Sequence, residues 1–224
     1  MIPVIFHHDG TLDKLMGDAI MAFFGAPVQV PQHPIKAAEA ALEMIAELHH
    51  LKKKRITGVD RLDAGIGINS GMVTIGNLGS HDFMDYTIIG DSVNIASRLE
   101  GLNKFYGTNV IVSEYTALRL DERFLLRELD RVRVKGKGQA MAIYQLIGYH
   151  DEVDKALIEM AEIFKNALGA FRDQKWDLAK NRLQDILKLL PADRPSKLYV
   201  ERIERLQIAP PEQGWDWVTD FDHK

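Results

Sequence analysis

The segment LDKLMGDAIMAFFGAP, residues Leu12–Pro27, consists of two apolar stretches separated by Gly17-Asp18. Because Gly and Asp favour turns and short apolar stretches are typical of strands, the segment predicts a β-hairpin. Along the first strand, alternation puts Lys14 on one face with apolar neighbours and Asp13 on the other face. Either the Lys14 ammonium reaches water past the sheet edge, or it is a buried donor that awaits an acceptor on a ligand.

Asp18 stands at the tip of this predicted hairpin. An aspartate in a turn usually serves only the turn. A carboxylate at a hairpin tip is also an accessible ligand for a hard cation such as Mg²⁺. The residue pattern by itself leaves both interpretations open.

Two further groups of polar residues stand out. In YTIIGDSVNIASRLEG (Tyr86–Gly101), Asn94 and Arg98 are four residues apart and share one face of a predicted helix. They form either a solvated pair or an amide and a planar guanidinium directed together at an anion. In VKGKGQ (Val134–Gln139), Lys135 stands next to glycines, which is typical of a turn but also lets the backbone approach a partner closely.

The composition is that of an ordinary soluble globular protein. Of the 224 residues, 46% are hydrophobic and 27% are charged. The net charge of -4 gives no basic footprint for nucleic acid or an anionic membrane surface. The absence of cysteine excludes disulfides and thiolate-bound metals, and no apolar run approaches the roughly 20 residues of a membrane span. We therefore expect a cytoplasmic chain with no nucleic-acid partner and no membrane segment, although a longer parent protein could be anchored elsewhere.

Up to about residue 149 the pattern predicts helices at residues 33–54 and 91–107 and strands at residues 62–71, 72–79, 83–90, 108–116, 124–136 and 141–148. This mixture of strands and helices predicts an α/β fold of one sheet with packed helices. From Asp151 to about Leu206 the apolar pattern is helical throughout. Ala179, Leu183, Ile186 and Pro191 have the spacing of a tetratricopeptide helix pair, although a solenoid needs about three repeats and one is present. We predict a first domain at residues 1–149 and a helical, tetratricopeptide-like extension at residues 150–224, which ends in an irregular tail.

Four segments together resemble the catalytic domain of class III nucleotidyl cyclases, the adenylate/guanylate cyclase family. They are Leu12–Pro27, Ala64–Ser80, Tyr86–Gly107 and Glu128–Gly148, and they cover roughly residues 9–148 in the family's order. The helical extension is similar to that of bacterial cyclases with a sensor upstream. The resemblance implies a ferredoxin-like palm sheet with packed helices. It also implies a head-to-tail homodimer with two composite sites between the subunits.

The resemblance also implies a role for each candidate residue. Lys14 and Thr87 match the residues that read the adenine edge, and guanylate cyclases typically carry glutamate at the lysine position, so ATP is favoured. Asp18 matches one of two aspartates that bind two Mg²⁺ or Mn²⁺ ions in each site. Asp18 would come from one subunit and the remaining residues from the other. By the same resemblance, Asn94 and Arg98 would orient the ribose and stabilise the transition state, and Lys135 would contact the triphosphate.

The chain departs from the family pattern at its beginning. Members usually have an earlier first strand with the second metal aspartate, and Asp9 stands where they have glycine. We therefore expect a sheet that lacks its first strand, and little cyclic AMP from this chain alone. Three functions stay open: part of an adenylate cyclase that forms cyclic AMP and pyrophosphate from ATP, a non-catalytic cyclase-homology module that regulates by dimerising, and an interaction protein that acts through the helical tail.

Overall fold

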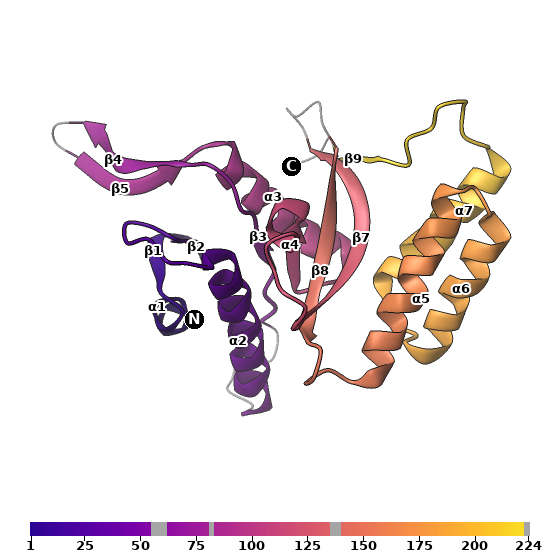
Figure 1. Ribbon diagram of the computed structural model, residues 1–224, viewed down its shortest axis with the longest axis horizontal. Coiled ribbons are helices and arrows are strands. Elements are labelled where there is room, and N and C mark those ends of the chain that lie inside the picture. Colours follow the sequence, from indigo (N-terminus) through magenta and orange to yellow (C-terminus); the bar gives the residue numbers. More distant parts are fainter. Residues whose placement is uncertain (55–61, 81–82, 135–139, 222–224) are drawn as a thin grey trace. The chain divides into compact units, whose positions relative to one another are not determined.

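The computed structural model describes residues 1–54, 62–80, 83–134 and 140–221 (Figure 1). Contacts between residues divide the chain into two compact units. The first consists of Met1–Gly101 and Asn109–Asp121, and the second of Leu102–Thr108 and Glu122–Lys224. Strands and helices are mixed, which confirms the expected α/β fold.

The first unit begins with the predicted hairpin. Strand β1 (Gly10–Met16) pairs antiparallel with β2 (Ala19–Phe24), and Gly17 occupies the turn with a φ of 66°, a conformation that glycine adopts without strain. A short helix that the sequence did not predict, α1 (Ile2–His7), precedes the hairpin. The long helix α2 (His33–Lys53) follows it, as predicted.

One part of the hairpin prediction is wrong. Leu12 pairs with Ala22 and Lys14 pairs with Met21, so Asp13 is an extra residue in β1 that has no partner in β2. Such a bulge interrupts the alternation of side chains between the two faces. Asp13 and Lys14 consequently do not point to opposite faces: Oδ1 of Asp13 lies 3.3 Å from Nζ of Lys14.

A second hairpin in this unit consists of β4 (Thr74–Ser80) and β5 (Phe83–Ile89), which Figure 1 shows as a projecting arm. Strand β3 (Ile66–Ile68) lies parallel to β6 (Val110–Ser113), and helix α3 (Asp91–Tyr106) connects the second hairpin to β6. These strands and α3 occur where the sequence predicted them.

Gly67 allows the closest approach between β3 and α3. A Cβ atom at this position would lie 2.2 Å from the carbonyl oxygen of Ala96 and 2.3 Å from the amide nitrogen of Glu100. The backbone of α3 therefore leaves space only for glycine. After β6, the chain forms the short helix α4 (Glu114–Ala117), although the sequence pattern suggested that the strand continued.

The second unit contains strands β7 (Phe124–Val134) and β8 (Met141–Tyr149), which pair antiparallel. Three helices follow, α5 (Lys155–Arg172), α6 (Trp176–Leu189) and α7 (Arg194–Ile208), and they lie side by side in Figure 1. Three of the four residues with tetratricopeptide spacing are buried in the core of these helices, Ala179, Leu183 and Ile186, whereas Pro191 is exposed.

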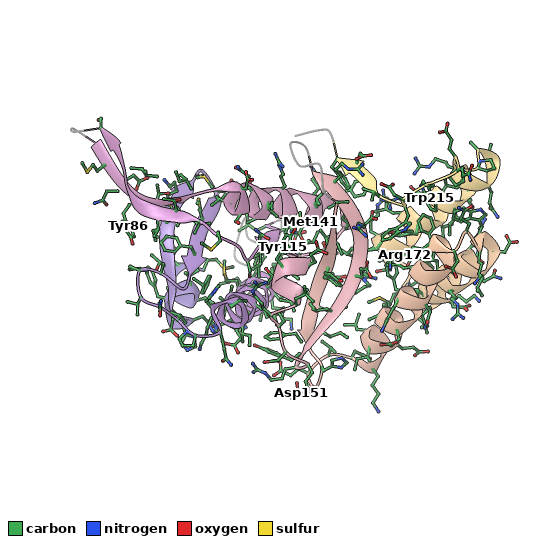
Figure 2. The ribbon with its side chains drawn as sticks, turned by 45° about the horizontal axis from the view of Figure 1, so that its top comes forward. Tyr86, Tyr115, Met141, Asp151, Arg172 and Trp215 are labelled. Atoms are coloured by element: carbon green, nitrogen blue, oxygen red, sulfur yellow. The ribbon has the colours of Figure 1, made fainter. Side chains whose placement is uncertain are left out.

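The tail is more ordered than the sequence suggested. Residues Thr219–Phe221 form strand β9, which pairs parallel with β7. The guanidinium of Arg172 lies 4.3 Å from the ring centroid of Trp217, and Trp215 packs against Phe171 (Figure 2 labels Arg172 and Trp215). Aromatic contacts of this kind bury large areas, so the tail is packed against the extension.

Buried charges connect the extension with the strands of the second unit. Arg127 on β7 lies 2.8 Å from Asp193, the residue that caps the N-terminus of α7, and both side chains are almost inaccessible to solvent. Asp130, which is also on β7 and 1% exposed, accepts hydrogen bonds from the side chains of Tyr106, Arg202 and Thr219. A buried charge without a partner lowers the stability of a fold, so the partners of Arg127 and Asp130 are needed to keep these side chains buried.

Candidate active site

Lys14 is anchored by two carboxylates. Its Nζ atom donates to Oδ2 of Asp85 over 2.5 Å and lies 3.3 Å from Oδ1 of Asp13. The hydrogen bond to Asp85 raises the pKa of Lys14, so the ammonium stays charged. The side chain is 34% exposed, and an ammonium has three donors. Lys14 is therefore neither a long surface side chain without partners nor a fully buried one, and it keeps a donor for a ligand.

Thr87 is buried and lies on the other side of Asp13. Its hydroxyl donates to the Asp13 carboxylate, with distances of 2.8 Å to Oδ2 and 3.0 Å to Oδ1. The backbone N–H of Ile88 donates to the same carboxylate over 3.1 Å, and the Asp13 side chain is not exposed. Asp13 thus connects the first hairpin to the second and brings Lys14 and Thr87 into one polar cluster.

Asp18 lies in the turn between β1 and β2 and is exposed. This position fits the requirement of a hard cation for an accessible carboxylate oxygen. One carboxylate holds Mg²⁺ or Mn²⁺ only together with other ligands, such as water and phosphate oxygens.

Asn94 and Arg98 lie one turn apart on α3, as predicted, and both are exposed. Within the described residues neither side chain forms a hydrogen bond or an ion pair, so both are available to a ligand. Lys135 lies outside the described residues. The structure therefore brings Lys14 and Thr87 together through Asp13, and it places Asp18, Asn94 and Arg98 at accessible positions.

Sequence reasoning missed two members of the polar cluster. Asp85 has the same parity as Thr87 on β5, so alternation along that strand would have placed it on the same face. The role of Asp13 depends on the bulge in β1, which no periodicity indicates.

A second charged cluster lies where α1 meets α2. Oε2 of Glu43 is 2.7 Å from Nε2 of His8 and 3.3 Å from Nδ1 of His7. Nδ1 of His8 also lies 3.6 Å from Glu39, so carboxylates occupy both nitrogens of this ring. The hydrogen bond from His8 lowers the pKa of Glu43. These contacts join the end of α1 to α2, and we call the four residues His7, His8, Glu39 and Glu43 the clamp.

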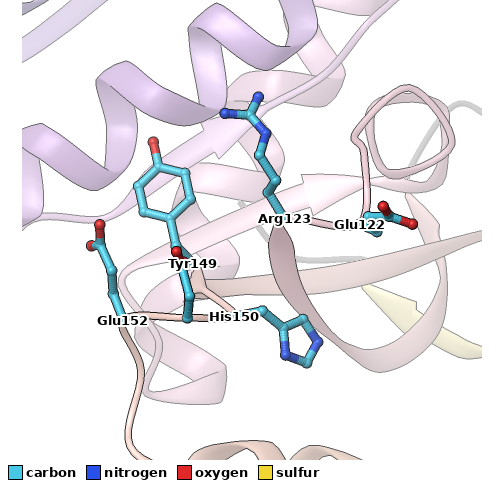
Figure 3. Close-up of a pocket in the computed structure, with 6 residues that line it drawn as sticks. Glu122, Arg123, Tyr149, His150 and Glu152 are labelled. Atoms are coloured by element: carbon cyan, nitrogen blue, oxygen red, sulfur yellow. The ribbon is translucent and has the colours of Figure 1, made fainter.

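An open pocket occurs in the second unit, between the start of β7 and the end of β8. Figure 3 shows its six lining residues, five of them labelled, and their side chains do not converge on one point. The lining of this pocket includes none of the candidate site residues Lys14, Asp18, Thr87, Asn94 and Arg98. Its lining consists of Glu122, Arg123, Tyr149, His150, Asp151 and Glu152.

The sequence of the first 148 residues corresponds to one known family. Residues 6–148 match the family described as the adenylate and guanylate cyclase catalytic domain, so the chain belongs to that family. Members generally use divalent metal ions. None of the helices in the described ranges is long and apolar enough to cross a lipid bilayer.

Two curated relatives are named as adenylate cyclases. The chain is 32% identical over 209 residues to "Adenylate cyclase, terminal-differentiation specific" of Dictyostelium discoideum, a match that covers 90% of this chain and 10% of that protein. It is 40% identical over 141 residues to an adenylate cyclase of Anabaena cylindrica, which covers 61% of this chain and 28% of that protein. The chain thus spans less than a third of either relative.

A solved structure with a similar fold is that of the guanylyl cyclase Cya2. It has a TM-score of 0.58 and 31% sequence identity, and the match covers 68% of this chain and 77% of that one. Because this structure is named for the other nucleotide, the choice between ATP and GTP has to be argued from the site itself.

Proposed function

We propose that this domain forms 3′,5′-cyclic AMP and pyrophosphate from ATP. The observation that supports ATP most directly is Lys14, a charged donor held by Asp85 and Asp13 beside Thr87. A fixed ammonium suits the acceptor nitrogen on the Watson–Crick edge of adenine. Guanine presents an N–H at the same position, and two donors that face each other lose their hydrogen bond.

The remaining candidate residues act on the sugar and the phosphates. The 3′-hydroxyl attacks the α-phosphate in line, and negative charge accumulates on the transferring group. Arg98 neutralises this charge, Asn94 orients the ribose, and Lys135 binds the triphosphate. Asp18 would hold the metal, with two Mg²⁺ or Mn²⁺ ions per site, and metal ions of this kind activate the attacking hydroxyl and position the phosphates.

We propose a head-to-tail homodimer in which Asp18 of one subunit completes the site of the other. Support comes from the arm formed by β4 and β5, which exposes several large apolar side chains. Met84 is 65% exposed, Tyr86, labelled in Figure 2, is 42% exposed, and Ile89 is 51% exposed. Apolar side chains gathered on a projecting arm indicate a surface that a partner covers.

For the extension we propose a tetratricopeptide-like helix pair, α5 and α6, within residues 150–224. The burial of Ala179, Leu183 and Ile186 between these helices supports this assignment. The family match ends at residue 148, which agrees with a catalytic domain at residues 1–149.

The test is complementation between two variants, Asp18→Asn and Arg98→Ala, of the full-length protein, a term that here means this chain together with the first strand and second metal aspartate expected from the family pattern. Each variant alone is expected to form almost no cyclic AMP from ATP, because each lacks one part of every composite site. After mixing and subunit exchange, heterodimers contain one site with both residues intact. Random assortment therefore predicts about a quarter of the wild-type activity.

Two results would contradict the proposal. If the mixture stayed as inactive as the separate variants, Asp18 and Arg98 would not belong to one shared site. If the unchanged full-length protein bound ATP but formed no cyclic AMP, a non-catalytic module would be the better description.

A further inference from the structure

We propose that Asp13 is a specificity-determining positioning residue: it fixes the Thr87 hydroxyl as a hydrogen-bond acceptor, and the site thereby selects 6-aminopurine over 6-oxopurine nucleotides. The inference rests on the proposed function, because it takes Lys14 and Thr87 as the residues that face the base. It assigns a role to a residue that does not itself touch the nucleotide.

The bulge in β1 places Asp13 where it can act on both residues. Since Asp13 has no partner in β2, it departs from the alternation that would direct it away from Lys14. Its carboxylate instead meets β5, where Thr87 and Ile88 donate to it, while the Lys14 ammonium lies 3.3 Å away. All the groups around the carboxylate are donors, which is the environment of an ionised aspartate.

The direction of the Thr87 hydrogen bond follows from this environment. An ionised carboxylate has no proton to donate, so the Thr87 hydroxyl proton must point at Asp13. Only the lone pairs of Oγ1 then remain for a ligand. A threonine hydroxyl in general both donates and accepts, but in this position it accepts.

An acceptor beside a donor is complementary to adenine. The 6-amino group donates and the adjacent ring nitrogen accepts, which matches Thr87 and Lys14 respectively. In guanine and hypoxanthine, the 6-oxo group accepts and the adjacent nitrogen carries a proton. Both positions are then mismatched, and unpaired polar groups in a binding site lower affinity strongly.

The experiment measures equilibrium binding of 3′-deoxy-ATP and 3′-deoxy-ITP to the full-length protein by calorimetry. These nucleotides lack the attacking hydroxyl, so turnover does not interfere, and their bases differ only at the 6-position and the adjacent ring nitrogen. The wild-type protein is expected to prefer 3′-deoxy-ATP by about 10- to 100-fold, the range for a good bidentate contact to a base.

The key variant is Asp13→Asn. Its amide can donate to Thr87, which frees the hydroxyl proton for a 6-oxo group, so the preference is expected to fall about tenfold. Asp85→Asn is the matched control, because Asp85 bonds to Lys14 whereas the hydroxyl bonds of Thr87 go to Asp13. This control is expected to keep more of the preference than Asp13→Asn.

Two substitutions of Thr87 keep the proposal testable if Asp13→Asn does not fold. Thr87→Ser retains the hydroxyl and is expected to retain the preference, whereas Thr87→Val removes the hydroxyl and is expected to lose the part of the preference that the hydroxyl supplies. In the Thr87→Val background, Asp13→Asn is expected to have no further effect on the preference, because Asp13 acts through the Thr87 hydroxyl. If Asp13 had a purely structural role, its substitution would change the preference to a similar extent in either background.

The outcomes separate the inference from the proposed function. If the wild-type protein bound neither nucleotide, or preferred the 6-oxo nucleotide, the proposed function would fail. If it preferred 3′-deoxy-ATP and a folded Asp13→Asn variant kept the full preference, the role of Asp13 would be overturned while the proposed function stood. Equal preference in Thr87→Ser and Thr87→Val would also overturn it.

Discussion

The Nζ atom of Lys14 and Oδ2 of Asp85, which are 71 residues apart in the sequence, lie 2.5 Å from each other between the two hairpins of the first unit. This contact holds the ammonium at the position where the proposed site needs a donor for the base. The substitution Lys14→Glu replaces the donor with an acceptor. We expect it to weaken the preference for ATP over GTP by about 1–3 kcal/mol, the scale of a polar contact to a base. The measurement is kcat/KM for both nucleotides, and an unchanged ratio would remove Lys14 from the site.

Arg98 is expected to act in the transition state. Arg98→Ala should lower kcat far more than it raises KM, by about 2.7–4 kcal/mol in activation free energy, which is typical for the loss of one stabilising donor. Lys104→Ala is the control, because Lys104 is an exposed cation on the same helix. A change confined to KM would indicate that Arg98 binds only the ground state.

The buried pair Arg127–Asp193 is expected to stabilise the second unit. Burial lowers the pKa of Arg127, and Asp193 opposes that shift. Arg127→Ala leaves Asp193 buried without its partner, so the free energy of unfolding should fall by about 3–5 kcal/mol. Urea denaturation measures this change.

The control for this pair is Lys188→Ala, because Lys188 and Asp185 form an ion pair with both side chains exposed. Exposed pairs contribute little to stability. If both variants unfolded at the same urea concentration, the buried pair would not hold the extension to β7.

The clamp at Glu43 predicts a dependence of stability on pH. The hydrogen bond from His8 lowers the pKa of Glu43 below its ordinary value of 4.5. A carboxylate with a lowered pKa stabilises the folded state above the ordinary pKa, and the contribution disappears as the pH falls through the folded-state pKa. The wild-type protein should therefore melt above Glu43→Gln near pH 6, and the gap should shrink below pH 4.5.

Thermal unfolding at several pH values measures this gap. Glu47→Gln is the control, because Glu47 is exposed on the same helix. A gap for Glu43→Gln that stayed constant from pH 6 to pH 3 would mean that the carboxylate charge is not what stabilises the clamp.

The sequence predicted the elements whose patterns are long and regular. The first hairpin, α2 and α3 follow from turn residues and from helical periodicity, which depend on local sequence. Helix α4 and strand β9 were not predicted, because each is only three or four residues long and too short to show a period. Short elements form only because the rest of the fold provides their partners.

Local sequence patterns also predicted only part of the candidate site. Lys14 and Thr87 were identified by resemblance, and their roles stay predictions, as do those of Asp18, Asn94, Arg98 and Lys135. Asp13 was assigned to the wrong face because the bulge in β1 breaks the alternation, and the donors that its carboxylate meets lie on β5, more than 70 residues away in the chain. Local alternation cannot contain information about a contact at that distance.

The most direct test of the central claim is the initial rate of cyclic nucleotide formation by the full-length protein, with ATP and with GTP, in the presence of Mg²⁺ or Mn²⁺. We predict that ATP is converted to cyclic AMP with a kcat/KM well above that for GTP. Formation of cyclic GMP from GTP with an equal or higher kcat/KM would contradict the account.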